Sequence, residues 1–295
     1  MDDYTSKNAF LELGSTSIKF YLVAASGENA GEVEHEEKIP WQLGYDVFEH
    51  QRISPRSISH CLSTLRKLAQ SFPEVPLEAV TAVGTAAMRE AQNAELFQRV
   101  LWDELRVKIH IIEGGIEAFL LETGFRSMVE IYPTGLFDLG GGSLELIEYL
   151  SAASTRKTSV PVGAVRLHSQ LRRARDLFEY IGNGRKVARR TLIEHLIGKP
   201  PVYPELIGTG GTVRAIVQCV GSEEFGVEDV QRLIQQEVHG PVWSQLKPHR
   251  RNLFLPGLLA VEALFTTLGA ERILQRQASV KQGLVSFTRI LPSGP

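Results

Sequence analysis

The sequence predicts an α/β protein made of two duplicated halves, each with a mixed sheet and flanking helices. The main observation is a glycine-rich turn preceded by a carboxylate, which occurs in FLELGSTSIKF at residues 10–20 and again in LFDLGGGSLEL at residues 136–146. At an offset of 126 residues, Glu12 aligns with Asp138. Apolar runs on both sides of each turn indicate a strand, a tight turn and a returning strand.

A second repeated segment supports the duplication. AVGTAAMRE at residues 82–90 is similar to LIGTGGTVRAI at residues 206–216, at nearly the same offset. In each copy a short apolar strand meets Gly-Thr and then a helical pattern, so we expect Thr85 and Thr209 to cap helices. Two different segments that recur in the same order predict an internal repeat of the whole unit.

The remaining pattern places helices between the repeats. Apolar residues at helical spacing predict helices over residues 57–71 and 94–105, followed by a strand over 107–112. A strongly apolar helix is predicted over residues 253–268, with Pro256 in its first turn. A polar turn before the second repeat predicts two domains, residues 1–125 and 126–295. We expect a ligand-binding cleft at their interface.

Composition gives more information about the cellular location of the protein than about its ligand. The formal net charge of −2 is small, so a polyanionic ligand requires a local basic patch. Cys61 and Cys219 lie in apolar, helix-like contexts, which predicts buried free thiols and a reducing compartment. The N-terminal residues lack signal-peptide features, and Pro256 and Glu262 interrupt the most apolar stretch. We therefore expect a cytoplasmic protein with no membrane span and no nucleic-acid partner.

The two turns have the chemistry of a phosphate site. Successive glycine and small polar residues expose backbone N–H groups that can surround phosphate oxygens. A carboxylate beside phosphate is repulsive unless a divalent cation lies between them, so Glu12 and Asp138 predict Mg²⁺. The alternative is a pair of tight hairpins with their carboxylates in solvent, and two copies in register favour the phosphate interpretation.

A third glycine-rich segment, GTGGT at residues 208–212, enters a predicted helix. Free N–H groups and the helix dipole at such a position favour a second phosphate. The predicted phosphate-binding residues are Gly14, Ser15, Thr16, Lys19, Gly141, Gly142, Ser143, Gly210, Gly211 and Thr212.

Seven segments together resemble the exopolyphosphatase/guanosine pentaphosphate phosphohydrolase (Ppx/GppA) family of the actin-like ATPase superfamily. They occur in family order and are LELGSTSIKF, VGTAAMREAQN, IIEGGIEAFLL, FDLGGGSLELI, VPVGAVRL, LIGTGGTVRAI and LPGLLAVEALFTTLGAERI. The resemblance covers residues 10–285 and implies two actin-like (ribonuclease H-like) domains and a possible homodimer. It also implies Mg²⁺-dependent release of terminal phosphate from inorganic polyphosphate or guanosine pentaphosphate.

The resemblance also implies roles for individual residues. Glu117 matches the glutamate that activates the attacking water, and Arg89 matches the arginine of the second segment. Asp138 matches the metal-site aspartate, and Glu145 matches the glutamate that positions metal and water, so the predicted metal ligands are these two with Glu12. The residues themselves agree, because Glu117 falls in the first turn of a predicted helix, where the dipole keeps a carboxylate ionised.

Departures from the family pattern lead to an alternative function. Glu12 replaces the usual aspartate, Ile116 replaces a glutamate and Phe119 replaces an arginine. Glu113 replaces a serine, while Thr16 in place of asparagine keeps a hydrogen-bonding side chain. These changes motivate a non-catalytic sensor that binds guanosine polyphosphates or polyphosphate. An ATP-dependent kinase on the same fold is a third possibility, and it requires an adenosine pocket that the sequence does not reveal.

Three further features leave their interpretation open. Lys19 occupies the repeat position of Glu145, and it either faces phosphate or is an outward strand residue. For Arg166 we favour a structural role. Residues 172–190 contain seven Lys or Arg against two acids, which indicates either a track for a polyanion or, more often, a solvated pair of helices.

Overall fold

The computed structural model describes residues 7–24, 32–126, 129, 131–196, 203–239, 246–276 and 283. The chain forms two compact units, of which the first reaches Ile116 and the second begins at Glu117. This division falls at the start of helix α5 (Gly114–Phe125). The predicted domain bounds, 1–125 and 126–295, stay a prediction.

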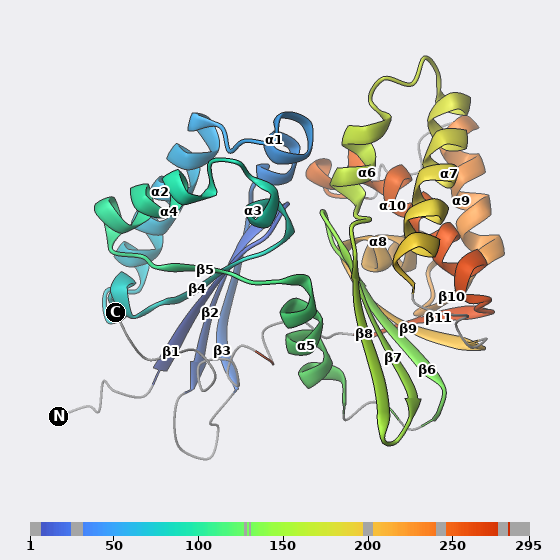
Figure 1. The fold of residues 1–295 in the computed structure, drawn as a ribbon, viewed down its shortest axis with the longest axis horizontal. Helices are drawn as coiled ribbons and strands as arrows, with labels where there is room; N and C mark the ends of the chain where they lie inside the picture. Colours follow the sequence, from blue (N-terminus) through green and yellow to red (C-terminus); the bar gives the residue numbers. More distant parts are fainter. Residues whose placement is uncertain are drawn as a thin grey trace. The chain divides into compact units, whose positions relative to one another are not determined.

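The first unit contains a five-stranded mixed sheet with the order β3-β2-β1-β4-β5 (Figure 1). Strands β1, β2 and β3 are antiparallel neighbours, whereas β4 runs parallel to β1 and β5 runs parallel to β4. The strand bounds are β1 (Lys7–Leu13), β2 (Ser17–Ala24), β3 (Val33–Pro40), β4 (Thr81–Gly84) and β5 (Ile109–Ile111).

The helices of the first unit follow the predicted pattern closely. Helix α4 has the predicted bounds, and α2 begins earlier than predicted because Ser54 caps it, accepting a hydrogen bond from the Ser57 amide. Thr85 occupies the N-cap position of α3, although its side chain makes no capping hydrogen bond. The helix bounds are α1 (Leu43–His50), α2 (Pro55–Ser71), a 3₁₀ turn η1 (Leu77–Ala79), α3 (Ala86–Glu90) and α4 (Ala94–Leu105).

The second unit repeats this sheet. Its order is β10-β11-β9-β6-β7-β8, so β8-β7-β6-β9-β11 corresponds to β3-β2-β1-β4-β5, with the same antiparallel and parallel pairings. The predicted duplicated α/β fold with mixed, ribonuclease H-like sheets is confirmed, while the predicted cleft between the halves stays a prediction. The strand bounds are β6 (Thr134–Leu139), β7 (Leu144–Ser151), β8 (Ser154–Val160), β9 (Glu205–Gly210), β10 (Glu224–Gly226) and β11 (Arg272–Gln275).

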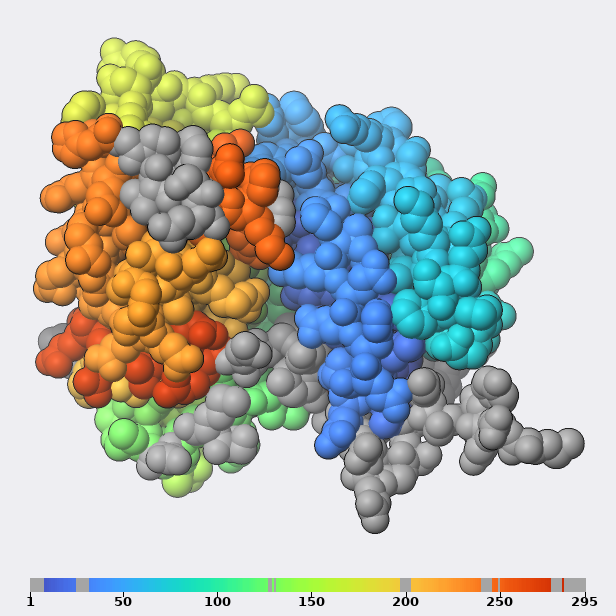
Figure 2. Space-filling view, turned by 180° about the vertical axis from the view of Figure 1, so that it is seen from behind, coloured from blue at the N-terminus to red at the C-terminus, as the bar shows by residue number. Residues whose placement is uncertain are grey.

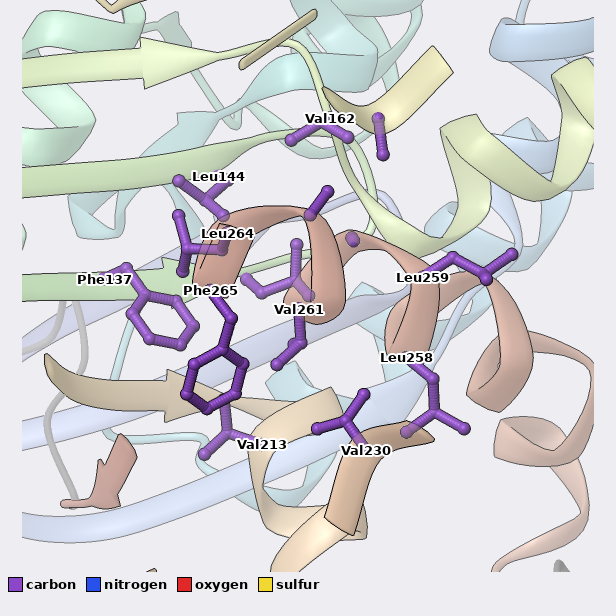
Figure 3. Close-up of a cluster of buried hydrophobic side chains, with 14 of the residues drawn as sticks. Phe137, Leu144, Val162, Val213, Val230, Leu258, Leu259, Val261, Leu264 and Phe265 are labelled. Carbon is purple, nitrogen blue, oxygen red and sulfur yellow. The ribbon is translucent and has the colours of Figure 1, made fainter. Parts of the chain in front are cut away.

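Helix α10 is the centre of the larger core in the second unit. Figure 3 shows Leu258, Val261, Leu264 and Phe265 of this helix among other buried side chains, including Phe137 of the sheet. The helices of this unit are α6 (Ala164–Leu171), α7 (Leu177–His195), α8 (Gly211–Val220), α9 (Val227–His239) and α10 (Pro248–Leu268).

Two predictions about helix starts in this unit are wrong. Pro256 lies inside α10, because the helix already begins at Pro248 and the buried apolar packing around it outweighs the local cost of an interior proline. Thr209 is not a cap but a fully buried residue of β9. The strand continues to Gly210, whose φ of 99° makes the bend into α8.

The two faces of the second sheet are covered differently. Residues of α5, Leu121 and Phe125, pack with Leu136 of β6 and Ile147 of β7, whereas Phe137 belongs to the core around α10. Because side chains alternate along a strand, Asp138 and Glu145 share the face that α5 covers.

Of the two cysteines, Cys61 is buried as predicted and Cys219 is only partly buried, and both are free thiols. In the parts of the chain that the structure describes, no helix has the length and apolar character needed to cross a membrane.

Candidate active site

The turn between β6 and β7 is held by the start of α6. The amide of Gly140 donates to the Ser143 carbonyl at 3.0 Å and closes the turn. The Ala164 amide donates to the Gly140 carbonyl at 3.1 Å, and the Val165 amide donates to the Gly141 carbonyl at 2.9 Å. Since the N–H and C=O of one planar peptide unit point in opposite directions, the amides of this turn point away from α6.

Arg166 and Gly163, which follow β8 in the chain, also hold the turn between β6 and β7 in its conformation. Arg166 Nε donates to the Gly142 carbonyl at 2.6 Å, so the guanidinium has the structural role that we favoured. Gly163 packs so closely that a Cβ atom there would lie 2.5 Å from the carbonyl carbon of Gly141. The conformation of the turn therefore depends on Arg166 and on the absence of a side chain at Gly163.

Three carboxylates meet beside this turn. Asp138 and Glu145 are directly opposite each other in the β6–β7 ladder, and Glu145 is only 3% exposed. Burial raises the pKa of Glu145 well above its usual range, and the negative charges of Glu117 and Asp138 raise it further. Ser159 Oγ donates to Glu145 Oε1 at 3.0 Å, and Ser143 also bonds this carboxylate.

Glu117 reaches this cluster from α5. It lies in the first turn of the helix, as predicted, and is 9% exposed. A buried carboxylate next to other carboxylates is stable only when it is protonated or when a cation neutralises it. The cluster therefore has the electrostatic character of a cation site.

The donor set of Asp138 and Glu145 fits Mg²⁺. The described ranges contain no group of three or more His, Cys, Asp or Glu residues that could hold a metal ion. Mg²⁺ does not require one, because it is commonly held by one or two carboxylates together with waters and substrate phosphate.

The third glycine segment lies against Asp138 of this cluster. Gly210 is so close to Asp138 that a Cβ atom there would overlap the carboxylate oxygen Oδ1. The guanidinium of Arg250, from the first turn of α10, lies against Gly211 at the start of α8. Burial lowers the pKa of Arg250, and the nearby Arg214 lowers it further. Such an arginine, placed at a helix N-terminus, is suited to an anion.

Arg250 was missed in the sequence. Apolar periodicity predicts a helix that begins at residue 253 and does not include Arg250. The only available signal was the pair of adjacent basic residues, Arg250 and Arg251, just before an apolar helix.

The first hairpin has a similar turn and different charges. The Gly14 amide donates to the Ser17 carbonyl at 3.0 Å, and the Gly44 amide of α1 donates to the Ser15 carbonyl at 2.8 Å. Lys19 Nζ donates to Glu12 Oε1 at 2.6 Å, and both side chains are largely buried. Lys19 is therefore not an outward strand residue, and the Glu12 carboxylate already has a cationic partner.

Arg89 belongs to the first unit, whereas the carboxylate cluster belongs to the second. Its Nη1 donates to the Ile112 carbonyl at 2.7 Å, between β5 and α5. This bond fixes the segment that leads into the helix carrying Glu117. A role of Arg89 in binding phosphate stays a prediction.

The sequence pattern of the Ppx/GppA phosphatase family matches residues 22–288. The chain belongs to this family. A bifunctional 3-dehydroquinate synthase/phosphatase of Fusobacterium nucleatum is 22% identical over 91% of this chain, and the chain spans 45% of that longer protein.

Solved structures of family members share the fold. A crystal structure of an exopolyphosphatase-like protein has a TM-score of 0.81, with 20% identity, covering 97% of this chain and all of that one. An exopolyphosphatase from Cytophaga hutchinsonii has a TM-score of 0.77 with 19% identity, covering 98% of this chain and 100% of that one. A Ppx/GppA family member from Aquifex aeolicus has a TM-score of 0.74 with 19% identity, covering 98% and 99% of the two chains.

Two of the departures from the family pattern, Ile116 and Phe119, lie on the exposed side of α5. Ile116 is 38% exposed and Phe119 is 40% exposed, whereas Glu117 between them is buried. The changes are therefore close to the carboxylate cluster in sequence and do not alter its charged groups.

The basic run lies on the surface of the second unit, where the start of α7 is visible in yellow-green (Figure 2). Several of its arginines pair with carboxylates, as in Arg175–Glu179 at 3.0 Å and Arg185–Glu262 at 2.7 Å. Such pairing is typical of a solvated helix, and a polyanion track on this surface stays a prediction.

Proposed function

We propose that this protein is a Mg²⁺-dependent phosphohydrolase that releases terminal phosphate from inorganic polyphosphate or guanosine pentaphosphate. The observation that carries the proposal is the cluster of Glu117, Asp138 and Glu145 beside two glycine turns. Membership of a phosphatase family supports hydrolysis as the reaction class, and the names of the exopolyphosphatase relatives support a phosphate chain as substrate.

Different residues around the cluster are proposed to bind the metal and the phosphates. In this proposal Asp138 and Glu145 hold Mg²⁺, which supplies charge neutralisation for the phosphate oxygens. The amides of Gly141, Gly142 and Ser143 bind the phosphate, in a turn that Arg166 and α6 keep in place. Gly210, Gly211 and Thr212 at the start of α8, with Arg250 against Gly211, offer donors to a neighbouring phosphate.

Glu117 is proposed as the general base that orients and deprotonates water. Its place in the first turn of α5 puts its carboxylate at the positive end of the helix dipole, beside the two proposed metal ligands. Positioning and charge neutralisation are the main demands of phosphoryl transfer, so a base, a cation site and an amide turn are sufficient.

The test is phosphate release from polyphosphate and from guanosine pentaphosphate, each with and without Mg²⁺. Glu117→Gln is expected to lower kcat about a hundredfold or more, as loss of a general base does. Glu113→Gln is the matched control, because this exposed glutamate precedes the same helix. Equal rates for the two variants would remove Glu117 from the proposed role.

A non-catalytic sensor is the second candidate, favoured by the apolar residues Ile116 and Phe119 at positions where the family usually has charged ones. Tight binding of guanosine polyphosphates or polyphosphate with no turnover at any Mg²⁺ concentration would select it. We also propose a cytoplasmic location, which suits a nucleotide substrate and two free thiols. The homodimer implied by family resemblance stays a prediction.

A further inference from the structure

One strand connects the buried carboxylate of the site to the helix that carries the proposed base. Lys157 and Ser159 are two residues apart in β8, so their side chains lie on the same face of the sheet. Ser159 donates to Glu145, and Lys157 Nζ donates to Glu122 Oε2 on α5 at 2.7 Å. The same stretch of β8 therefore contacts both Glu145 of the site and α5, the helix that carries Glu117.

Glu122 is a buried carboxylate in the middle of α5. It is 5% exposed, and its two carboxylate oxygens are bonded by different cations. Arg126 Nη1 donates to Oε1 at 3.2 Å, and Lys157 bonds Oε2. Arg126 directly follows the last residue of α5 and its side chain is 66% exposed, so its bond does not join the helix to the sheet. The Lys157 bond, by contrast, joins the helix to the sheet.

Lys157 makes a second contact with the same helix. Its ammonium lies 5.7 Å from the ring centroid of Phe119, within the range of a cation–π interaction. Phe119 stands where the family usually has an arginine. In this chain a cation next to that part of α5 is thus supplied by β8.

The apolar contacts of α5 do not define its position along the sheet by themselves. Leu121 and Phe125 pack on Leu136 and Ile147, and burial of apolar surface is non-directional. The ion pair between Lys157 and Glu122 is directional, because it joins two specified atoms. A displacement of about 1 Å in a reacting group can cost roughly a hundredfold in rate.

We propose that Lys157 is a positioning residue that fixes α5 on β8 and thereby presents Glu117 to the carboxylates of Asp138 and Glu145. The inference rests on the proposed phosphohydrolase function for its effect on rate. Its effect on the helix does not depend on that function, so the two can be tested separately.

The experiment compares Lys157→Met, Lys157→Arg and the matched control Arg126→Met in the full-length protein. Arg126→Met removes a cation from the same carboxylate without removing the link to the sheet. We expect Lys157→Met to lower kcat on polyphosphate about tenfold or more, with KM within roughly twofold of the unmodified protein. Lys157→Arg should recover most of the rate, and Arg126→Met should stay near the original value.

Hydrogen–deuterium exchange gives a readout that needs no turnover. Lys157→Met should speed exchange of the amides in Gly114–Phe125, while exchange in β6 and β7 stays unchanged and Arg126→Met has little effect. If the unmodified protein releases no phosphate, the proposed function fails and the exchange pattern alone decides the inference. If Lys157→Met does not fold, Glu122→Gln, which breaks the same link, takes its place. Exchange and kcat that match those of Arg126→Met would overturn the proposal.

Discussion

The two hairpins β1–β2 and β6–β7 have similar turns but differ in the charge of one cross-strand partner. Each turn is closed by a glycine amide that donates to a serine carbonyl at 3.0 Å, and in each a carbonyl of the turn is bonded by an amide from the helix after the third strand. Glu12 is directly opposite Lys19 in the first ladder, and Asp138 is directly opposite Glu145 in the second.

The difference between the hairpins lies in this one cross-strand pair. An acid opposite a base forms an ion pair, so the first hairpin carries its own counterion. An acid opposite an acid raises the pKa of the buried partner, so the second hairpin favours either a proton or an added cation. A duplicated scaffold has thus kept its backbone while the charge at one position changed the ligand that it suits.

The largest effect should follow from giving the second hairpin the charges of the first. In Glu145→Lys the new ammonium faces Asp138 as Lys19 faces Glu12, so we expect a folded protein. The ammonium would then occupy the place of Mg²⁺ beside Asp138. Because metal catalysis is worth several kcal/mol, phosphate release should fall about a thousandfold. Circular dichroism checks that the variant is folded, and a phosphate-release assay measures its activity. Substantial Mg²⁺-dependent activity in the variant would contradict the assigned difference between the hairpins.

A smaller effect, on stability, should follow from breaking the first pair. Lys19→Met leaves the carboxylate of Glu12, which is 6% exposed, without its ammonium partner. We expect a loss of about 1–3 kcal/mol in the free energy of unfolding, measured in urea. The double variant Glu12→Gln/Lys19→Met should regain most of this loss. If the single variant is as stable as the unmodified protein, the ion pair does not hold the hairpin.

The raised pKa of Glu145 predicts that the stability gained by Glu145→Gln depends on pH. A carboxyl group whose pKa is higher in the folded state destabilises the fold when it ionises, so stability falls as the pH rises from the unfolded pKa to the folded pKa. Without metal, Glu145→Gln should therefore melt at the same temperature as the unmodified protein in acid. Near neutral pH it should melt at a higher temperature than the unmodified protein. A lower melting temperature for the variant at pH 7 would contradict this sign.

The smallest effect should come from restoring the usual family residue in the first hairpin. Glu12→Asp changes a carboxylate that pairs with Lys19, so kcat and the Mg²⁺ requirement should stay within about twofold. Loss of a group that orients a metal ligand typically costs about 10- to 100-fold. A change of that size, measured in a Mg²⁺ titration of phosphate release, would show that the first hairpin also serves the metal.

Much of the fold could be predicted from the sequence, because the repeats carry it. The glycine turns define two hairpins in register, and alternation along the strands puts Asp138 and Glu145 on one face. Glu117 was correctly placed in the first turn of a helix. These features depend on local chain geometry, which the residue pattern encodes directly.

The features that the sequence did not predict depend on contacts between segments that are far apart in the chain. Arg250 meets Gly211 only because α10 packs beside α8, and the link between Lys157 and Glu122 joins a strand to a helix far away in sequence. Thr209 and Pro256 were misplaced because tertiary burial outweighed local preferences for caps and helix starts. The roles of the site residues stay predictions, since position alone does not measure binding or rate.

The most direct test of the account is where the divalent cation binds. Mn²⁺, a spectroscopic substitute for Mg²⁺, can be titrated into the protein in the presence of inorganic phosphate and followed by electron paramagnetic resonance. We expect Asp138→Asn and Glu145→Gln to lose this binding, whereas Glu12→Gln should keep it. Binding that survives in both second-hairpin variants, or disappears in Glu12→Gln, would contradict the assignment of the metal to the second hairpin.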